Sequence, residues 1–113
     1  MDPNIATFLV EYYETLHNNS REVNNVYVDG ARLIIFQGID QPKAFVSDYA
    51  KYIPIGKRKI LKYSGSTIGS RLFVHVQSEI EQPYNKLIVD ESFSCVLSDV
   101  SIMISYHLSL IHI

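Results

Sequence analysis

Five side chains in this sequence belong to the types that carry acid–base chemistry in an enclosed site. Tyr12 and Tyr13 are adjacent, and a tyrosine hydroxyl that lines a cavity can donate a hydrogen bond to a ligand. His75, Asp90 and His107 fall on neighbouring predicted strands, where they could form an acid–base set if all three faced one interior. The alternation of apolar residues places His75 and Asp90 off the main apolar face. The pattern therefore favours packing roles for the tyrosines over a catalytic set.

The sequence gives less support for a metal-binding site or a catalytic nucleophile than for an acid–base set. His17, His75, His107 and His112 have no ligand-like spacing among themselves or with Cys95. Cys95 is the only cysteine and lies in an alternating apolar run, which predicts a buried thiol of a reducing compartment. No glycine-rich loop or nucleophile motif is present. We therefore expect no metal, no cofactor and no enzymatic activity.

The charge pattern argues against nucleic acid and membrane as partners. The net charge is −2, whereas a nucleic-acid-binding domain of this size normally has a basic surplus. The one basic cluster, Lys57 to Lys62, has only Tyr63 as an aromatic neighbour and is typical of a solvated strand edge. No leader opens the chain, and no apolar stretch reaches the roughly 18 residues that span a bilayer. We expect a soluble, intracellular protein.

The N-terminal part of the chain predicts three helices around one strand. The first helix begins at Asp2-Pro3, a capping carboxylate followed by proline, and ends at residues 17–19. Ser20 is predicted to cap a short second helix that ends near residues 26–27, before Asp29-Gly30 turns the chain. A strand over residues 33–36 follows.

The third predicted helix runs from a capping Asp40 to Pro54. Phe45, Tyr49 and Ile53 are spaced four apart and would form its inner face.

From residue 57 the apolar period changes to two, which predicts strands. The expected strands cover residues 59–63, 72–77, 86–97 and 102–112, with turns over 64–69, 82–85 and 98–99. Hairpin connections make this meander antiparallel, and helices gathered on one face make the class α+β. The 113 residues fit a single domain, 1–113.

One face of the long strand over residues 86–97 is too apolar for plain solvent surface. Leu87, Val89, Phe93, Cys95 and Leu97 face one side. The opposite side is formed by Ile88, Asp90, Ser92, Ser94 and Val96. We interpret this second side as a face that packs against another protein, and so expect a dimer.

The first half of the chain resembles the nuclear transport factor 2 family. Phe8, Tyr12 and Tyr13 are spaced as in its first helix, residues 26–29 precede an apolar strand, and residues 41–54 continue the match. The resemblance implies a cone, in which three helices pack on a curved antiparallel sheet around a hydrophobic cavity. It also implies that family members dimerise through the open face of the sheet. The cavity and partner-binding positions would be Ile35, Phe36, Tyr49, Ile53, Leu87 and Leu108.

The sequence departs from nuclear transport factor 2 where that protein contacts its partners. The chain has no tryptophan, and Ile35 and Phe36 stand in the aligned strand. Glu79 and Glu81 are the candidates for the acidic pair that faces the GTPase Ran. The Asn-Asp-apolar-Phe-Arg motif of the last strand is absent, and residues 106–109 stand roughly there.

The resemblance implies three functions. The first is a dimeric adaptor of nucleocytoplasmic transport that binds phenylalanine-glycine nucleoporin repeats, with Ran-GDP as a further candidate partner, in cytoplasm and nucleus and at the nuclear pore. The second is the small subunit of a messenger-RNA export receptor, paired with a homologous domain. The third is a cone-fold isomerase or dehydratase, which would need a carboxylate such as Asp29 or Asp90 inside the cone. We expect an apolar pocket with no carboxylate directed into its centre.

Overall fold

The computed structural model describes residues 3–18, 22–37, 39–42, 56–99 and 101–112. Within these residues the chain forms one α-helix, one 3-10 helix and six strands. The helices are α1 (Pro3–Asn18) and η1 (Glu22–Val26). The strands are β1 (Tyr27–Gln37), β2 (Ile39–Pro42), β3 (Lys57–Ile68), β4 (Arg71–Glu81), β5 (Lys86–Leu97) and β6 (Ile102–His112).

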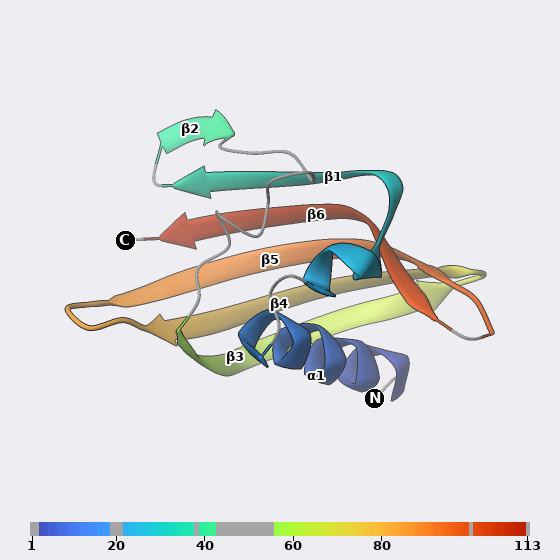
Figure 1. Cartoon of the computed structure of the whole chain (residues 1–113), viewed down its shortest axis with the longest axis horizontal. Helices are drawn as coiled ribbons and strands as arrows, with labels where there is room; N and C mark the ends of the chain where they lie inside the picture. Colours follow the sequence, from blue (N-terminus) through green and yellow to red (C-terminus); the bar gives the residue numbers. More distant parts are fainter. Residues whose placement is uncertain (1–2, 19–21, 38, 43–55, 100, 113) are drawn as a thin grey trace.

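All six strands belong to one sheet, in the order β2-β1-β6-β5-β4-β3. β3 to β6 form the antiparallel meander that the sequence predicts. β1 pairs with β6 in parallel, so the first strand of the chain lies beside the last one (Figure 1). This pairing places the N-terminal strand next to the C-terminal half of the meander.

Helix α1 packs its apolar stripe against one face of the sheet. Ile5, Phe8, Leu9, Tyr12 and Leu16 are all buried, and they follow the spacing of three and four that predicts this helix. η1 lies on the same side of the sheet (Figure 1). We call this covered side the inner face of the sheet and the opposite side the outward face. In the described part of the chain, no helix is long and apolar enough to cross a membrane.

Two predicted turns are strand instead. β1 runs through Asp29 and Gly30, where the register with β6 shifts and Gly30 takes a positive φ of 78°. Glycine tolerates this conformation, so the strand bends there without ending. β3 likewise continues to Ile68, and the turn to β4 comes at residues 69–70, where Gly69 has a φ of 59°.

The predicted start of the third helix is wrong. Residues Ile39–Pro42, including Asp40, form β2 and pair with the end of β1. Residues 39–42 pair with β1 as a hairpin. This pairing competes with a helix start in which Asp40 would be the capping residue. The rest of that predicted helix, including Tyr49 and Ile53, lies outside the described residues, so three helices are not confirmed.

Gly65 is required by close strand approach. A Cβ atom there would lie 2.2 Å from the carbonyl oxygen of Phe73 on β4 and 3.1 Å from Cδ1 of Ile5 on α1. We expect Gly65→Ala to lower the free energy of unfolding by about 2 kcal/mol or more, because the backbone of a paired strand must shift. Urea denaturation measures this.

The matched control is the next residue on β3. Ser66 is exposed, so Ser66→Ala should change the free energy of unfolding by no more than about 0.5 kcal/mol. Equal stabilities for the Gly65→Ala and Ser66→Ala proteins would contradict this account of the glycine.

Candidate functional site

A carboxylate lies at the centre of the inner face. Glu91 on β5 is 0% exposed, as is His107 on the neighbouring strand β6. Oε2 of Glu91 and Nε2 of His107 are 2.5 Å apart. An ionised carboxylate only accepts hydrogen bonds, so Nε2 of His107 is the donor.

Two further groups bind the other carboxylate oxygen. The Tyr13 hydroxyl donates to Oε1 of Glu91 at 2.8 Å, and Nη1 of Arg58 donates to the same oxygen at 2.8 Å. The Arg58 guanidinium also lies over the Tyr13 ring, 4.2 Å from its centroid. Helix α1 and strand β3 therefore each supply one partner for a carboxylate on β5.

The network continues on the far side of the imidazole. Nδ1 of His107 lies 2.9 Å from the Tyr27 hydroxyl, which lies 2.8 Å from the Tyr12 hydroxyl. In a neutral His107 with its proton on Nε2, Tyr27 donates to Nδ1. We call the six residues the Glu91 network: Tyr12, Tyr13, Tyr27, Arg58, Glu91 and His107.

Aromatic packing fixes the positions of these groups. His107 lies opposite Phe93 in the β5–β6 pairing, and their rings stack with centroids 4.0 Å apart. Phe93 also contacts the rings of Phe8 and Tyr12, each at 5.1 Å. Since adjacent helical residues point in different directions, Tyr12 reaches Tyr27 while Tyr13 reaches Glu91.

The surroundings keep Glu91 ionised and Tyr13 protonated. Burial by itself raises the pKa of the Glu91 carboxyl, but the hydrogen bond and charge of His107, the charge of Arg58 and the Tyr13 hydrogen bond lower it to about 2. Burial, together with the negative charge of Glu91, raises the pKa of Tyr13 well above its usual value. The thiol of Cys95 is also buried, which raises its pKa to about 12 and makes it unreactive.

A cavity of about 360 Å³ reaches the network from one side. It lies between α1 and the first residues of β3, and its apolar walls include Leu9, Leu16 and Ile60. Tyr13 and Arg58 line it as well, so two of the Glu91 partners reach this space. Glu91 and His107 do not line this cavity.

The outward face is open and partly apolar. Its exposed large apolar side chains include Phe73 on β4, Tyr106 and Leu110 on β6, and Ile68 at the end of β3. A pocket of about 310 Å³ opens there; Phe73 and Tyr106 line it, together with Ser92 and Ser94 of β5.

A second polar cluster lies on the same outward face. Nε2 of His112 lies 3.0 Å from Oδ2 of Asp90, and Nε2 of His75 lies 3.7 Å from Oδ1. Gln77 donates to Oδ1 at 3.2 Å. Within the described residues, no group of three His, Cys, Asp or Glu side chains could hold a metal ion.

The similarity to known proteins lies in three dimensions. No protein-family model and no curated protein sequence matches the chain. A nuclear transport factor 2-like protein of unknown function from Methylobacillus flagellatus superposes with a TM-score of 0.73 and 13% identity, over 96% of this chain and 90% of that one. Nuclear transport factor 2 from Cryptosporidium parvum gives 0.71 at 16% identity, over 99% and 98%. The chain has the nuclear transport factor 2-like fold.

Enzymes are represented among proteins with this fold. A proposed ketosteroid isomerase from Parabacteroides distasonis superposes with a TM-score of 0.70 and 4% identity, over 90% of this chain and 83% of that one. The nuclear transport factor 2-like fold therefore does not by itself decide between adaptor and enzyme, and the side chains must be weighed directly.

The sequence did not predict a buried carboxylate, but Glu91 does not line the cavity beside α1, so the expected apolar pocket with no carboxylate directed into its centre stays a prediction. Asp29 is exposed and Asp90 lies on the outward face, but Glu91 stands in the core. Glu91 lies two residues from both Val89 and Phe93, so strand alternation places its side chain on the same, inward side. Sequence reasoning left Glu91 unassigned because burying a charged residue is costly, although alternation along the strand places it inside.

The predicted cavity residues divide between the two faces. Ile35 and Leu87 are buried with the core. Phe36 and Leu108 are half-buried on the outward face, so Leu108 does not line the cone interior. The inward positions of β6 are instead taken by His107, Ser109 and Ile111, because this face accommodates the Glu91 network.

The residues predicted for partner contacts are all on the outward face. Ile88, Asp90, Ser92, Ser94 and Val96 alternate with buried residues along β5, as their spacing predicts. Glu79 and Glu81 lie on β4; Glu79 is opposite Lys59, and Glu81 is opposite both Lys57 and Lys86.

The ionised Glu91 should make the fold acid-sensitive. Its folded pKa of about 2 is below the ordinary 4.5, so its stabilising effect is present above about pH 4.5 and disappears as the pH falls toward 2. We expect a loss of about 3 kcal/mol in the free energy of unfolding across this range. Urea denaturation at pH 7, 5, 4 and 3 measures it.

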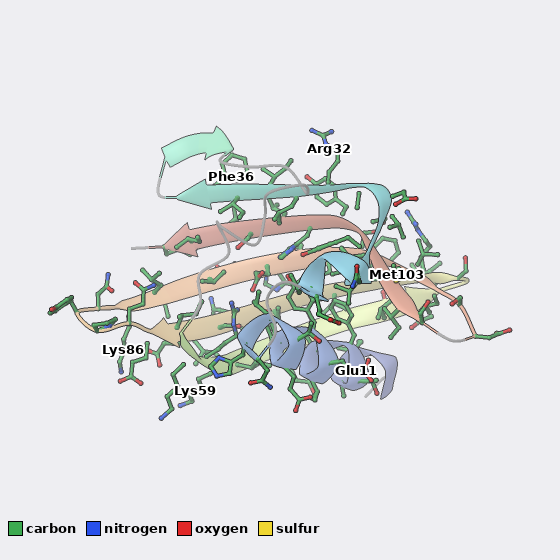
Figure 2. All side chains as sticks on the ribbon, in the orientation of Figure 1. Glu11, Arg32, Phe36, Lys59, Lys86 and Met103 are labelled. Atoms are coloured by element: carbon green, nitrogen blue, oxygen red, sulfur yellow. The ribbon has the colours of Figure 1, made fainter. Side chains whose placement is uncertain are left out.

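Two variants separate Glu91 from the other carboxylates. Glu91→Gln removes the carboxylate that Arg58, His107 and Tyr13 all bind, so it should lower stability at pH 7 by about 3–5 kcal/mol and flatten the acid dependence. Glu11→Gln alters an exposed glutamate of α1 and should leave the acid dependence unchanged (Figure 2). The same acid slope in wild type and Glu91→Gln would contradict the assignment.

Proposed function

We propose that this protein is a non-catalytic adaptor of nucleocytoplasmic transport that acts as a dimer of nuclear transport factor 2-like domains. The observation that carries the proposal is the uncovered, partly apolar outward face of the sheet, where Phe73, Tyr106 and Leu110 are exposed. Monomeric proteins rarely expose contiguous apolar patches of this kind. A stable interface buries about 800 Å² on each partner, which a face of several strands can supply.

The low pKa and the occupied oxygens of Glu91 support an adaptor over an enzyme. A general base needs a pKa near the working pH and must reach the substrate. Glu91 has a pKa of about 2, and Arg58, Tyr13 and His107 already bind its oxygens. A carboxylate in this state holds the fold together, and it has little capacity to accept a proton from a substrate.

The transport role rests on the resemblance of the first half of the chain. In this proposal Phe36 on β1 contacts phenylalanine rings of nucleoporin repeats, whereas Leu108, which lies opposite Ser92, belongs to the dimer face. Contacts of this kind are few and exchange fast. Ran-GDP would bind weakly, because no tryptophan anchor is present and Glu79 and Glu81 each lie opposite a lysine.

The alternative partner is a homologous domain on another chain, as in a messenger-RNA export receptor. The same outward face would serve both arrangements, so the test must ask first whether the chain associates with itself.

Light scattering on the purified protein tests the proposal. At tens of micromolar and pH 7.5 we expect a mass of about twice 12.9 kDa. Leu110→Asp places a charge on the outward face and should produce a monomer. Val10→Asp, on an exposed position of α1, should leave the dimer intact. A wild-type monomer would contradict the homodimer and favour the heterodimeric export subunit.

A second candidate function is catalysis by the Glu91 network. The specific observation in its favour is a carboxylate, an imidazole and three tyrosine hydroxyls joined inside a fold that a proposed ketosteroid isomerase shares. A ketosteroid isomerisation assay tests it. We expect no turnover above buffer; turnover by the wild type that Glu91→Gln abolishes would favour the enzyme.

A further inference from the structure

The outward face carries a histidine–aspartate–histidine cluster that the proposed dimer would bury. His75 on β4 and His112 on β6 lie on the two sides of Asp90 on β5, and each directs its Nε2 at a different carboxylate oxygen. Their side chains are 47% and 59% exposed, whereas Asp90 is 23% exposed. Three neighbouring strands thus place two protonatable groups around a single carboxylate.

Histidine is the side chain whose charge ordinarily changes between about pH 5 and 8. With both rings neutral, the cluster carries the single negative charge of Asp90. With both rings protonated, one carboxylate faces two cations, and the cluster becomes positive. A change of two charges on one small area is large compared with the net charge of the whole chain, which is −2.

The charges around the cluster decide what this change does. Next to His75, β3 contributes Ser64 opposite and Lys62 one pair along, while β5 contributes Ser92 and Asp90. Next to His112, β5 contributes Ile88 opposite, with Asp90 and Lys86 on either side; its neighbours on the β1 side lie outside the described residues.

On the described residues of β1 and β3 to β6, the outward face carries six basic side chains against this carboxylate and two glutamates. The glutamates are Glu79 and Glu81 on β4. The basic side chains are Arg32, Lys57, Lys59, Lys62, Arg71 and Lys86. Lys59 and Lys86 lie at one end of the sheet, and Arg32 lies on β1 (Figure 2). Protonating the histidines therefore adds positive charge to a face that is already positive.

We infer that protonation of His75 and His112 weakens the association of two chains through the outward face. In a two-fold dimer the same patch meets itself, so both copies gain like charge together. Repulsion rises, and charged imidazoles lose more hydration on burial than neutral ones. This inference rests on the homodimer proposed above and adds its regulation: the dimer is stable at neutral pH and loosens in mildly acidic solution.

The test is the dissociation constant of the dimer at pH 7.5 and pH 5.5, measured by sedimentation equilibrium at fixed ionic strength. For the wild type we expect the constant to rise at least tenfold at pH 5.5. The double variant His75→Gln/His112→Gln should show a change of less than twofold. His17→Gln, on α1 and away from this face, should behave like the wild type.

Circular dichroism at pH 5.5 checks that every protein is folded. Glu91 keeps its stabilising effect above about pH 4.5. A change in the dissociation constant between pH 7.5 and 5.5 therefore does not come from protonation of Glu91.

Each outcome has one meaning. A wild-type dimer with equal dissociation constants at both pH values would overturn this inference and leave the proposed dimer standing. A wild-type monomer at pH 7.5 would overturn both. A tenfold loss that persists in the double variant would show that other groups carry the pH dependence and would overturn the role of these two histidines.

Discussion

The structure depends on compensating one negative charge buried in the middle of its sheet. An uncompensated ionised carboxylate in a protein core is strongly destabilising, and a buried ion pair that loses one partner costs about 3–5 kcal/mol. Glu91 is fully buried, and its partners come from three different elements: Tyr13 from α1, Arg58 from β3 and His107 from β6. These elements must therefore dock in one relative arrangement. An apolar residue at 91 would bury well but would leave their orientation less defined, so we attribute to Glu91 a role in specifying the fold as well as stabilising it.

The remainder of the inner face follows from this requirement. His107 needs a partner for Nδ1, and Tyr27 provides it at the point where η1 leads into β1. The hydroxyl of Tyr27 in turn contacts Tyr12 of the long helix. Aromatic rings fill the space around these polar groups, and Phe93 stacks directly on the imidazole. Side chains of the protein itself surround Glu91 and His107, both of which are fully buried.

Much of the fold was predictable from periodicity. The helical stripe of α1 and the alternation of β5 and β6 gave correct elements, because local apolar patterns decide strands and helices that lie on a core. The pairing of β1 with β6, the hairpin strand β2 and the full length of β3 were not predictable in this way. They depend on contacts between residues far apart in sequence, or on a glycine such as Gly65 that serves strand approach and looks locally like a turn.

The candidate site was harder to predict than the fold. His107 and the tyrosines were noted as chemically competent, but the carboxylate that joins them was sought at Asp90, one position away. Strand alternation along β5 places the side chain at position 91 inside. A charged residue is nevertheless usually assigned to the surface, because burying its charge costs free energy when no partner compensates it. The offsetting groups, Arg58 and Tyr13, lie 33 and 78 residues away in the sequence, and only the folded chain brings them to Glu91.

Both faces of the sheet carry imidazole and carboxylate groups, but these groups are buried on the inner face and accessible to solvent on the outward face. On the inner face an imidazole and a carboxylate are closed off from water, and they are hydrogen-bonded to each other and to three neighbours, Tyr13, Tyr27 and Arg58. On the outward face two imidazoles and a carboxylate remain in contact with solvent. Because strand alternation places Asp90 and Glu91 on opposite faces, adjacent residues serve different purposes. Glu91 fixes the arrangement of the core, and Asp90 contacts two histidines and a glutamine on the outward face.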